Sequence, residues 1–136
     1  VSFVFQNAAL MKYYTVAENI EMPLLSMNVG KKERKKIIEE KMEAVGIAHL
    51  AKKLPIHISG GEQTRTAIAR ALAGDNELLL ADEPTGALDQ TTGKEIMEVF
   101  KKVHEMGKTI ILITHDPNVA AYADRIIRIE DGKIIN

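Results

Sequence analysis

The segment Ser59-Gly60-Gly61-Glu62 restricts what this chain can fold into more than any other part of the sequence. Its Ser-x-x-Glu spacing is that of a capping box, in which the serine hydroxyl and the glutamate carboxylate accept hydrogen bonds from backbone N–H groups at a helix start. The two glycines leave the backbone uncovered, so an anion can approach the unpaired N–H groups at the positive end of the helix dipole. Taken alone, the segment is explained better by an ordinary capped helix, because capping boxes are common.

The residues that follow shift this balance toward a binding site. Glu77 to Ala81 form a short apolar run that indicates a buried strand of a parallel sheet. Asp82 and Glu83 come next, at the carboxyl end of the strand, where open α/β sheets bind their ligands. In a nucleotide hydrolase the first carboxylate can hold Mg²⁺, usually through water, and the second can take a proton from the attacking water. Two adjacent acids repel each other, which favours a bound cation, although a plain acidic turn explains the same residues equally well.

Five motifs in this chain resemble those of the ABC-type ATPases and occur in the order found in that family. The matches are Gln6 as the Q-loop glutamine, Ile58 to Leu72 as the signature motif and its helix, Leu78 to Glu83 as the Walker B strand, Gly86 to Asp89 as the D-loop, and His115 as the switch histidine. Coincidence does not explain five such matches in one order. Residues 81–86 and 21–25 most resemble the branch that serves lipoprotein release, macrolide export and peptide-antibiotic resistance.

The resemblance implies an α/β fold of the P-loop NTPase type, with a RecA-like parallel sheet and a helical subdomain. Residues 1–136 would form one partial ABC ATPase domain. Within it, residues from about 8 to 57 would form the helical subdomain, and residues 1–7 and 58–136 the RecA-like part. The cofactors that the resemblance implies are ATP and Mg²⁺.

The resemblance also assigns roles in ATP hydrolysis to single residues. Asp82 would position Mg²⁺, Glu83 would polarise the attacking water, and His115 would contact the γ-phosphate and hold this water in line. Gln6 would touch the metal or the water and sense the membrane partner across the helical subdomain. In the signature motif, the residues that would contact the nucleotide of a facing domain are Ser59, Gly60, Gly61 and Glu62. In the D-loop, Asp89 would line the interface between the two domains.

The chain contains no Gly-x-x-x-x-Gly-Lys-Ser/Thr loop of the kind that wraps the β- and γ-phosphates. Its only Gly-Lys-Thr, at Gly107, has Lys102 where the first glycine should stand, and we interpret it as a helix stop followed by a strand. In the family the phosphate loop precedes the Q-loop glutamine. This chain opens on a strand without an initiator methionine, so we expect a fragment of a longer protein. We expect the fragment to bind ATP weakly or not at all, and its full-length parent to hydrolyse ATP.

Charge and composition limit the kinds of partner that we expect this chain to bind. A formal net charge of -1 at pH 7 gives no reason to expect nucleic acid, and the absence of cysteine suits a cytosolic protein. No stretch approaches the roughly 20 apolar residues that span a bilayer. The resemblance implies two partners, a second ABC ATPase domain bound head to tail and a separate transmembrane permease subunit. We therefore expect a cytoplasmic protein that is peripheral on the inner face of the cell membrane.

Hydrophobic spacing and turn residues predict the remaining elements. We expect Thr15 and Glu18 to cap a short helix that Pro23 ends or kinks, and a glycine to stop each of two longer helices. Asp131-Gly132 predicts a hairpin. The predicted strands cover residues 1–5, 109–114, 125–130 and 133–135, the second of them buried, and the predicted helices cover residues 31–45, 92–106 and 118–123.

Several residues that could indicate other functions have simpler explanations. The basic run over residues 31–36 is balanced by acidic residues, so we expect a solvated helix face rather than a nucleic-acid patch. The remaining histidines lack partners at the spacing of a ligand site, and the methionines are better explained as core fillers than as a cofactor site. These residues are His49, His57 and His104, and Met22, Met27, Met42 and Met97.

Two other functions compete with transport. DNA-repair and chromosome-organising ATPases share these motifs, but they insert a long coiled coil between the Q-loop glutamine and the signature serine. The interval here, from Gln6 to Ser59, is 53 residues (59 minus 6), which is too short for such an arm. A truncated, catalytically incompetent remnant of a transporter ATPase stays open as an alternative. An in-frame phosphate loop encoded upstream of Val1 would argue against it.

Overall fold

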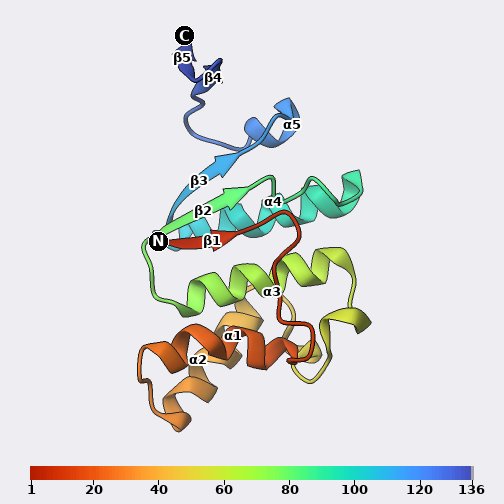
Figure 1. Cartoon of the computed structure of the whole chain (residues 1–136), viewed down its shortest axis with the longest axis vertical. Coiled ribbons are helices and arrows are strands. Elements are labelled where there is room, and N and C mark those ends of the chain that lie inside the picture. Colours follow the sequence, from red (N-terminus) through yellow and green to blue (C-terminus); the bar gives the residue numbers. More distant parts are fainter. Residues whose placement is uncertain (136) are drawn as a thin grey trace.

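The computed structural model describes residues 1–135 and contains a three-stranded parallel sheet. β1 (Ser2–Val4) pairs with β2 (Leu78–Asp82), and β2 pairs with β3 (Thr109–Ile113). The three arrows in Figure 1 point the same way, so all three strands end at one edge of the sheet. The predicted parallel sheet is therefore confirmed.

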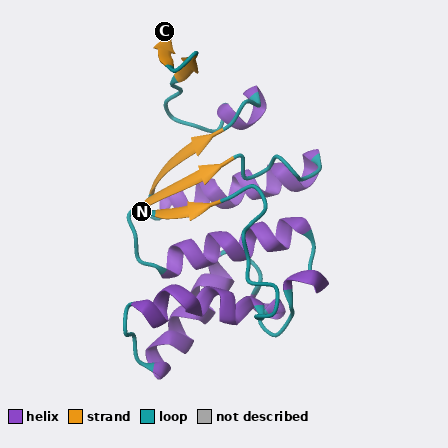
Figure 2. Ribbon diagram, viewed as in Figure 1, coloured by secondary structure: helices purple, strands orange, loops and turns teal. Residues whose placement is uncertain are grey.

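Two helices cover one face of this sheet (Figure 2). α3 (Gly60–Ala73) packs against β1, and α4 (Gln90–Glu105) packs against β3 and α3. α4 starts at Gln90 rather than at about residue 92, because the Asp89 side chain caps it. Val4 and Leu79 on the covered face are fully buried, and burial of such an aliphatic side chain contributes about 1.5–3 kcal/mol. This layer holds a large part of the core.

The opposite face of the sheet is open, which corrects the prediction of a buried strand over residues 109–114. Phe3 pairs with Leu80, and Leu80 pairs with Ile111, so the three side chains share one face. Phe3 is 49% exposed and Ile111 is 48% exposed. A strand that is apolar at every position is expected where both faces are covered. Among the described residues, helices cover only one.

A further helical layer lies below α3 in Figure 1. It consists of α1 (Val16–Ser26) and α2 (Lys31–Ala44), which both pack against α3. Two short 3₁₀ turns, η1 (Ala48–Leu50) and η2 (Pro55–His57), lead from α2 to the start of α3. The basic side chains at the start of α2 are mostly exposed, as predicted.

Pro23 does not end α1, which leaves a kink as its predicted effect on the helix. The helix begins with the predicted capping box of Thr15 and Glu18 and continues past the proline to Ser26. A proline removes only one backbone hydrogen bond from a helix. Leu24, next to it, is fully buried, and its packing against the core keeps the last turn helical.

The methionines act as core fillers only in part. Met42 and Met97 are buried as predicted, and Met22 is half-buried. Met27 is 47% exposed, so its prediction was wrong. It occupies the C-cap of α1, where the chain turns away from the core.

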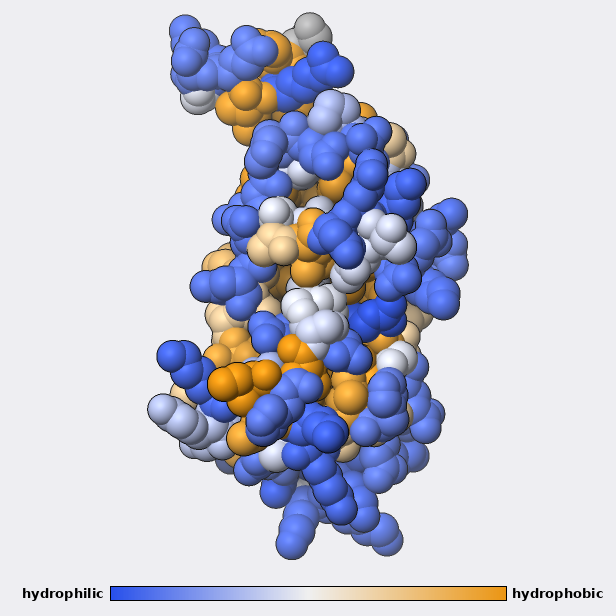
Figure 3. Space-filling model, turned by 90° about the vertical axis from the view of Figure 1, so that its right-hand side faces the viewer, coloured by the Kyte–Doolittle hydropathy of each residue, from blue (hydrophilic) through white to orange (hydrophobic). Residues whose placement is uncertain are grey.

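The C-terminal part of the described chain is a small, exposed appendage. α5 (Pro117–Ala120) is followed by a hairpin of β4 (Arg128–Glu130) and β5 (Lys133–Ile135). Asp131 and Gly132 have φ values of 50° and 75°, as a two-residue hairpin turn requires, so the hairpin prediction is confirmed. Figure 3 shows the hairpin projecting beyond the body of the molecule. No helix within residues 1–135 has the length and apolar character needed to cross a membrane.

Candidate functional site

The loops that follow β1, β2 and β3 bring Gln6, Glu83 and His115 to one edge of the sheet. β2 ends at Asp82, and Glu83 then adopts a φ of 45°, in the left-handed region that side chains disfavour. The Glu83 N–H donates to the carbonyl oxygen of Ile113 at 2.9 Å, which extends the pairing of β2 with β3 by one residue. This bond fixes the loop at the point where the two adjacent acids leave the sheet.

Glu83 and His115 form the tightest contact of this edge. His115 Nδ1 lies 2.6 Å from Glu83 Oε1, and the His115 backbone N–H donates to the same oxygen at 3.0 Å. The Glu83 side chain is 22% exposed, whereas that of His115 is 89% exposed. A carboxylate next to Nδ1 favours a proton on that nitrogen, which leaves Nε2 of a neutral ring as an acceptor. The pair therefore combines an oriented carboxylate with an accessible imidazole.

Gln6 and Asp82 lie at the same edge of the sheet. Both line one shallow hollow, together with residues of the β1 loop and Ala87. The Gln6 amide also lies against Gly86, where an added Cβ would come within 2.8 Å of Gln6 Nε2. Carboxylate and amide oxygens are the ligands that Mg²⁺ prefers, and it needs few of them because phosphates and water complete its shell. Within residues 1–135 no group of three or more acidic, histidine or cysteine side chains gathers as a complete metal site.

The start of α3 has the predicted capping box. Ser59 Oγ accepts a hydrogen bond from Glu62 N–H at 3.2 Å, and Glu62 Oε1 accepts one from Ser59 N–H at 2.8 Å. The N–H groups of Gly60 and Gly61 have no hydrogen-bond partner among the residues described. Gly61 also has a packing role that the sequence did not reveal, because an added Cβ would lie only 2.5 Å from Thr92 Cγ2 of α4.

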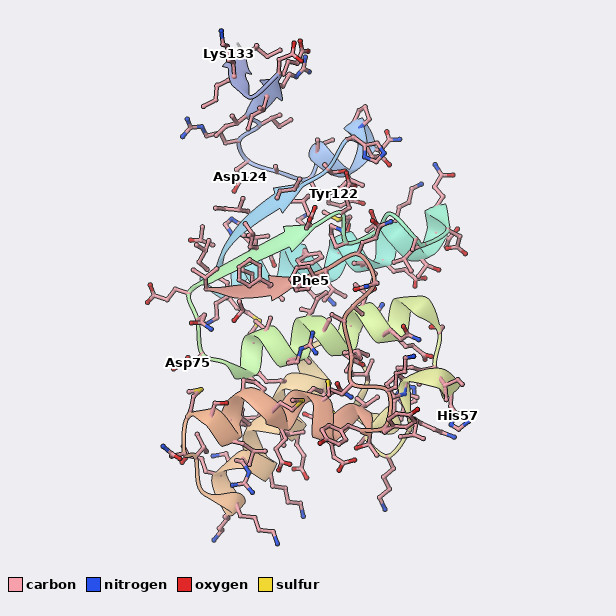
Figure 4. All side chains as sticks on the ribbon, viewed as in Figure 1. Phe5, His57, Asp75, Tyr122, Asp124 and Lys133 are labelled. Atoms are coloured by element: carbon pink, nitrogen blue, oxygen red, sulfur yellow. The ribbon has the colours of Figure 1, made fainter. Side chains whose placement is uncertain are left out.

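Asp89 is the N-cap of α4 and makes no hydrogen bond with Glu83 or His115 in the described chain. Its Oδ1 accepts a hydrogen bond from Thr92 N–H at 2.7 Å, and hydrogen bonding by Thr92 lowers the pKa of the Asp89 carboxyl. Asp89 also lines a cavity between α4 and α5, with Asp116 and Tyr122 on the opposite wall. Figure 4 labels Tyr122 on the α5 side of the sheet edge.

His104 and Arg70 make hydrogen bonds that the sequence did not indicate. His104 bonds to the Lys108 carbonyl through Nδ1, at 2.9 Å, and to Asp124 through Nε2, at 3.0 Å. Both hydrogen bonds raise the pKa of His104, and the one to the Lys108 carbonyl has the larger effect. Arg70 of α3 donates to two backbone carbonyls of the loop after β1. His49 and His57 are exposed as predicted, and Figure 4 places His57 among the helices below the sheet.

Comparison with known proteins identifies the family. The model of the ABC transporter family matches residues 1–86. The chain belongs to the ABC transporter family. It is 47% identical over 134 residues to an uncharacterized ABC transporter ATP-binding protein of Thermotoga maritima, and 44% identical over 134 residues to the macrolide export ATP-binding/permease protein MacB of Neisseria meningitidis. These alignments cover 98% of this chain but only 57% and 21% of the two relatives.

Solved structures confirm the expected fold of this ABC transporter family member. The dimeric ATP-binding cassette MJ0796, in a post-hydrolysis state bound to ADP and Pi, aligns with a TM-score of 0.84 and 41% identity. It covers 99% of this chain, which spans 60% of that structure. CbiO1 of Clostridium perfringens, part of the ABC transporter complex cbiONQ, aligns with a TM-score of 0.92 and 30% identity over 99% of this chain and 55% of its own. The fold is that of an ABC ATPase cassette of the P-loop NTPase class.

Proposed function

We propose that the whole protein to which residues 1–136 belong is the ATP-hydrolysing subunit of a membrane transporter. Membership of the ABC transporter family supports this function, as does the likeness to a cassette whose solved structure is bound to ADP and Pi. Residues 1–136 contain no phosphate-loop sequence. The proposal therefore concerns the whole protein, and for residues 1–136 alone we expect weak ATP binding or none.

The observation that carries the proposal is the contact between Glu83 and His115. The backbone N–H and the ring Nδ1 of His115 both engage Oε1 of Glu83, and within the described chain no hydrogen bond reaches Oε2. Oε2 is therefore the oxygen that can accept a proton from an attacking water. His115 holds the carboxylate in one orientation, and its exposed Nε2 can donate to a phosphate oxygen when the ring carries a proton on both nitrogens. Glu83 thus acts as the base and His115 as the residue that orients it.

Asp82 and Gln6 would hold Mg²⁺ through their side-chain oxygens, because both line the hollow next to Glu83. When bound, the ion neutralises charge on the phosphates. Asp82 is exposed, so its carboxylate is free to bind the metal through water.

The remaining sites and partners follow from the same proposal. Ser59, Gly60, Gly61 and Glu62 bind the nucleotide of a second ABC ATPase domain, and Asp89 lines the interface with it. The unpartnered N–H groups at the start of α3 support the first contact. A dimeric solved relative supports a second domain, and a relative named as an ATP-binding/permease protein supports a transmembrane permease partner. The protein then lies on the cytoplasmic face of the membrane. The division into a helical subdomain at about residues 8–57 and a RecA-like remainder also stays a prediction.

The decisive experiment replaces Glu83 with Gln in the whole protein. Because the amide keeps the shape of the side chain but cannot take a proton, ATP binding should persist while hydrolysis falls by about a hundredfold or more. Glu77→Gln is the matched control, since Glu77 is exposed just before the other end of β2. Hydrolysis is followed by phosphate release and binding by calorimetry. Full turnover in Glu83→Gln would remove Glu83 from its role, and micromolar ATP binding by residues 1–136 alone would contradict the expected division of the site.

A further inference from the structure

The loop after β1 is bent in an unfavourable way directly behind Gln6. Ala8 and Ala9 have φ values of 61° and 48°, in the left-handed region where a Cβ is disfavoured. Ala8 is 2% exposed and donates its N–H to the Phe5 carbonyl at 3.0 Å. Ala9 donates its N–H to Asn7 Oδ1 at 3.1 Å. Two successive residues in this conformation need outside contacts to hold them there.

One side chain of α3 supplies such contacts. Arg70 donates from Nη1 to the Ala9 carbonyl and from Nη2 to the Ala8 carbonyl, both at 2.9 Å. The planar guanidinium fork matches two neighbouring carbonyls, which a single ammonium group cannot do. Burial lowers the pKa of Arg70, but a guanidinium keeps its charge at neutral pH. The bend is therefore held by a charge-assisted pair of hydrogen bonds.

α1 holds the same loop from the other end. Asn19 is fully buried, and its Oδ1 accepts a hydrogen bond from Met11 N–H at 2.8 Å. Its Nδ2 donates to the Met11 carbonyl at 3.2 Å and to the carbonyls of Tyr14 and Thr15. The loop from Ala8 to Met11 is thus fixed between α3 and α1, with Gln6 at its open end.

We propose that Arg70 is a positioning residue for Gln6, and that it ties the loop carrying Gln6 to the helix that Ser59 caps. Arg70 stands 11 residues after Ser59 (70 minus 59), which is about 16 Å along a helix axis. α3 is buried along most of its length, so we expect it to move as a rigid body. A shift of its N-terminus is carried by Arg70 to the carbonyls behind Gln6. The catalytic part of this inference rests on the proposed function, and the structural part does not.

Hydrogen exchange in the whole protein tests the structural part. In Arg70→Gln, exchange of the amides over residues 8–11 should accelerate by about tenfold or more, because two charge-assisted hydrogen bonds are lost. Arg70→Lys should give a smaller acceleration. Arg65→Gln is the matched control, since Arg65 is also a half-buried arginine of α3 but donates to the Val45 carbonyl at 2.8 Å. Arg65→Gln should change amide exchange around residue 45 and leave amide exchange over residues 8–11 unchanged.

Three results would overturn the structural part: unchanged exchange over residues 8–11 in Arg70→Gln, equal acceleration there in Arg65→Gln, or wild-type exchange in Arg70→Lys. If Arg70→Gln does not fold, Arg70→Lys decides alone.

Steady-state kinetics of the same variants test the catalytic part. Because Arg70 acts through Gln6 and not on the nucleotide, Arg70→Gln should lower kcat about tenfold and leave KM for ATP within about threefold. Arg70→Lys should recover part of kcat, and Arg65→Gln should match the wild type. An unchanged kcat in Arg70→Gln would overturn the positioning role. A wild-type protein that hydrolyses no ATP would instead overturn the proposed function, and the exchange result would then decide the role of Arg70 alone.

Discussion

The substitution Gly61→Ala tests how far the packing of α3 against α4 depends on the absence of a side chain at position 61. A Cβ on Gly61 would lie 2.5 Å from Thr92 Cγ2, about 1 Å inside the 3.5–4.0 Å optimum for two carbon atoms. Overpacking of this kind costs about 1–3 kcal/mol, whereas alanine gains about 1 kcal/mol over glycine in a helix. We expect Gly61→Ala to lower the free energy of unfolding by about 1 kcal/mol net.

Urea unfolding of Gly61→Ala in two backgrounds, the wild type and Thr92→Ala, separates the clash from the helix propensity. In the Thr92→Ala background the colliding methyl group is gone, so Gly61→Ala should raise the free energy of unfolding by up to about 1 kcal/mol. Gly93→Ala is the matched control, because its added Cβ would meet Thr85 at an ordinary 3.6 Å. It should be neutral or stabilising in both backgrounds. The same loss from Gly61→Ala with and without Thr92 would refute the steric argument.

Two further outcomes follow from capping and titration. Ser59→Ala removes the cap of α3 and should cost about 1 kcal/mol in urea unfolding; a loss below about 0.3 kcal/mol would mean that the cap is not formed in solution. The Lys108 carbonyl and Asp124 raise the pKa of His104, so its protonated form stabilises the fold fully below the ordinary histidine pKa of about 6.5, and this contribution is lost as pH rises through the folded value. The stability difference between wild type and His104→Gln should therefore shrink from about pH 6 to about pH 8, and a difference that stays constant with pH would contradict it.

The sequence predicts this fold best where the signal is local. Both capping boxes depend on residues three positions apart, and the hairpin depends on Asp131-Gly132, so each could be identified from its own segment. Exposure of the sheet could not be predicted in this way. The run over residues 109–113 is apolar at almost every position, but whether each of its faces is covered depends on which other elements pack there.

Arg70 shows why contacts distant in sequence stay hidden. It sits in a helix segment rich in alanine, where an arginine is unremarkable by propensity. Its partners are backbone carbonyls more than 60 residues away, and a carbonyl carries no sequence signal. The only indication on the partner side is the pair Ala8-Ala9 in a left-handed bend, which alanine does not predict. Such a contact can be found only once the fold is known.

Glu83 combines both kinds of information, and this explains why its identity was predictable but its geometry was not. Its place after an apolar strand indicates a carboxylate at the sheet edge. Its φ of 45° is unfavourable by about 1–2 kcal/mol for a residue with a Cβ. The bonds from its N–H to Ile113 and from His115 to its carboxylate offset that cost. Glycine would relax the backbone here but would lose the carboxylate, so a glutamate held in this conformation indicates that the side chain matters more than the strain it brings.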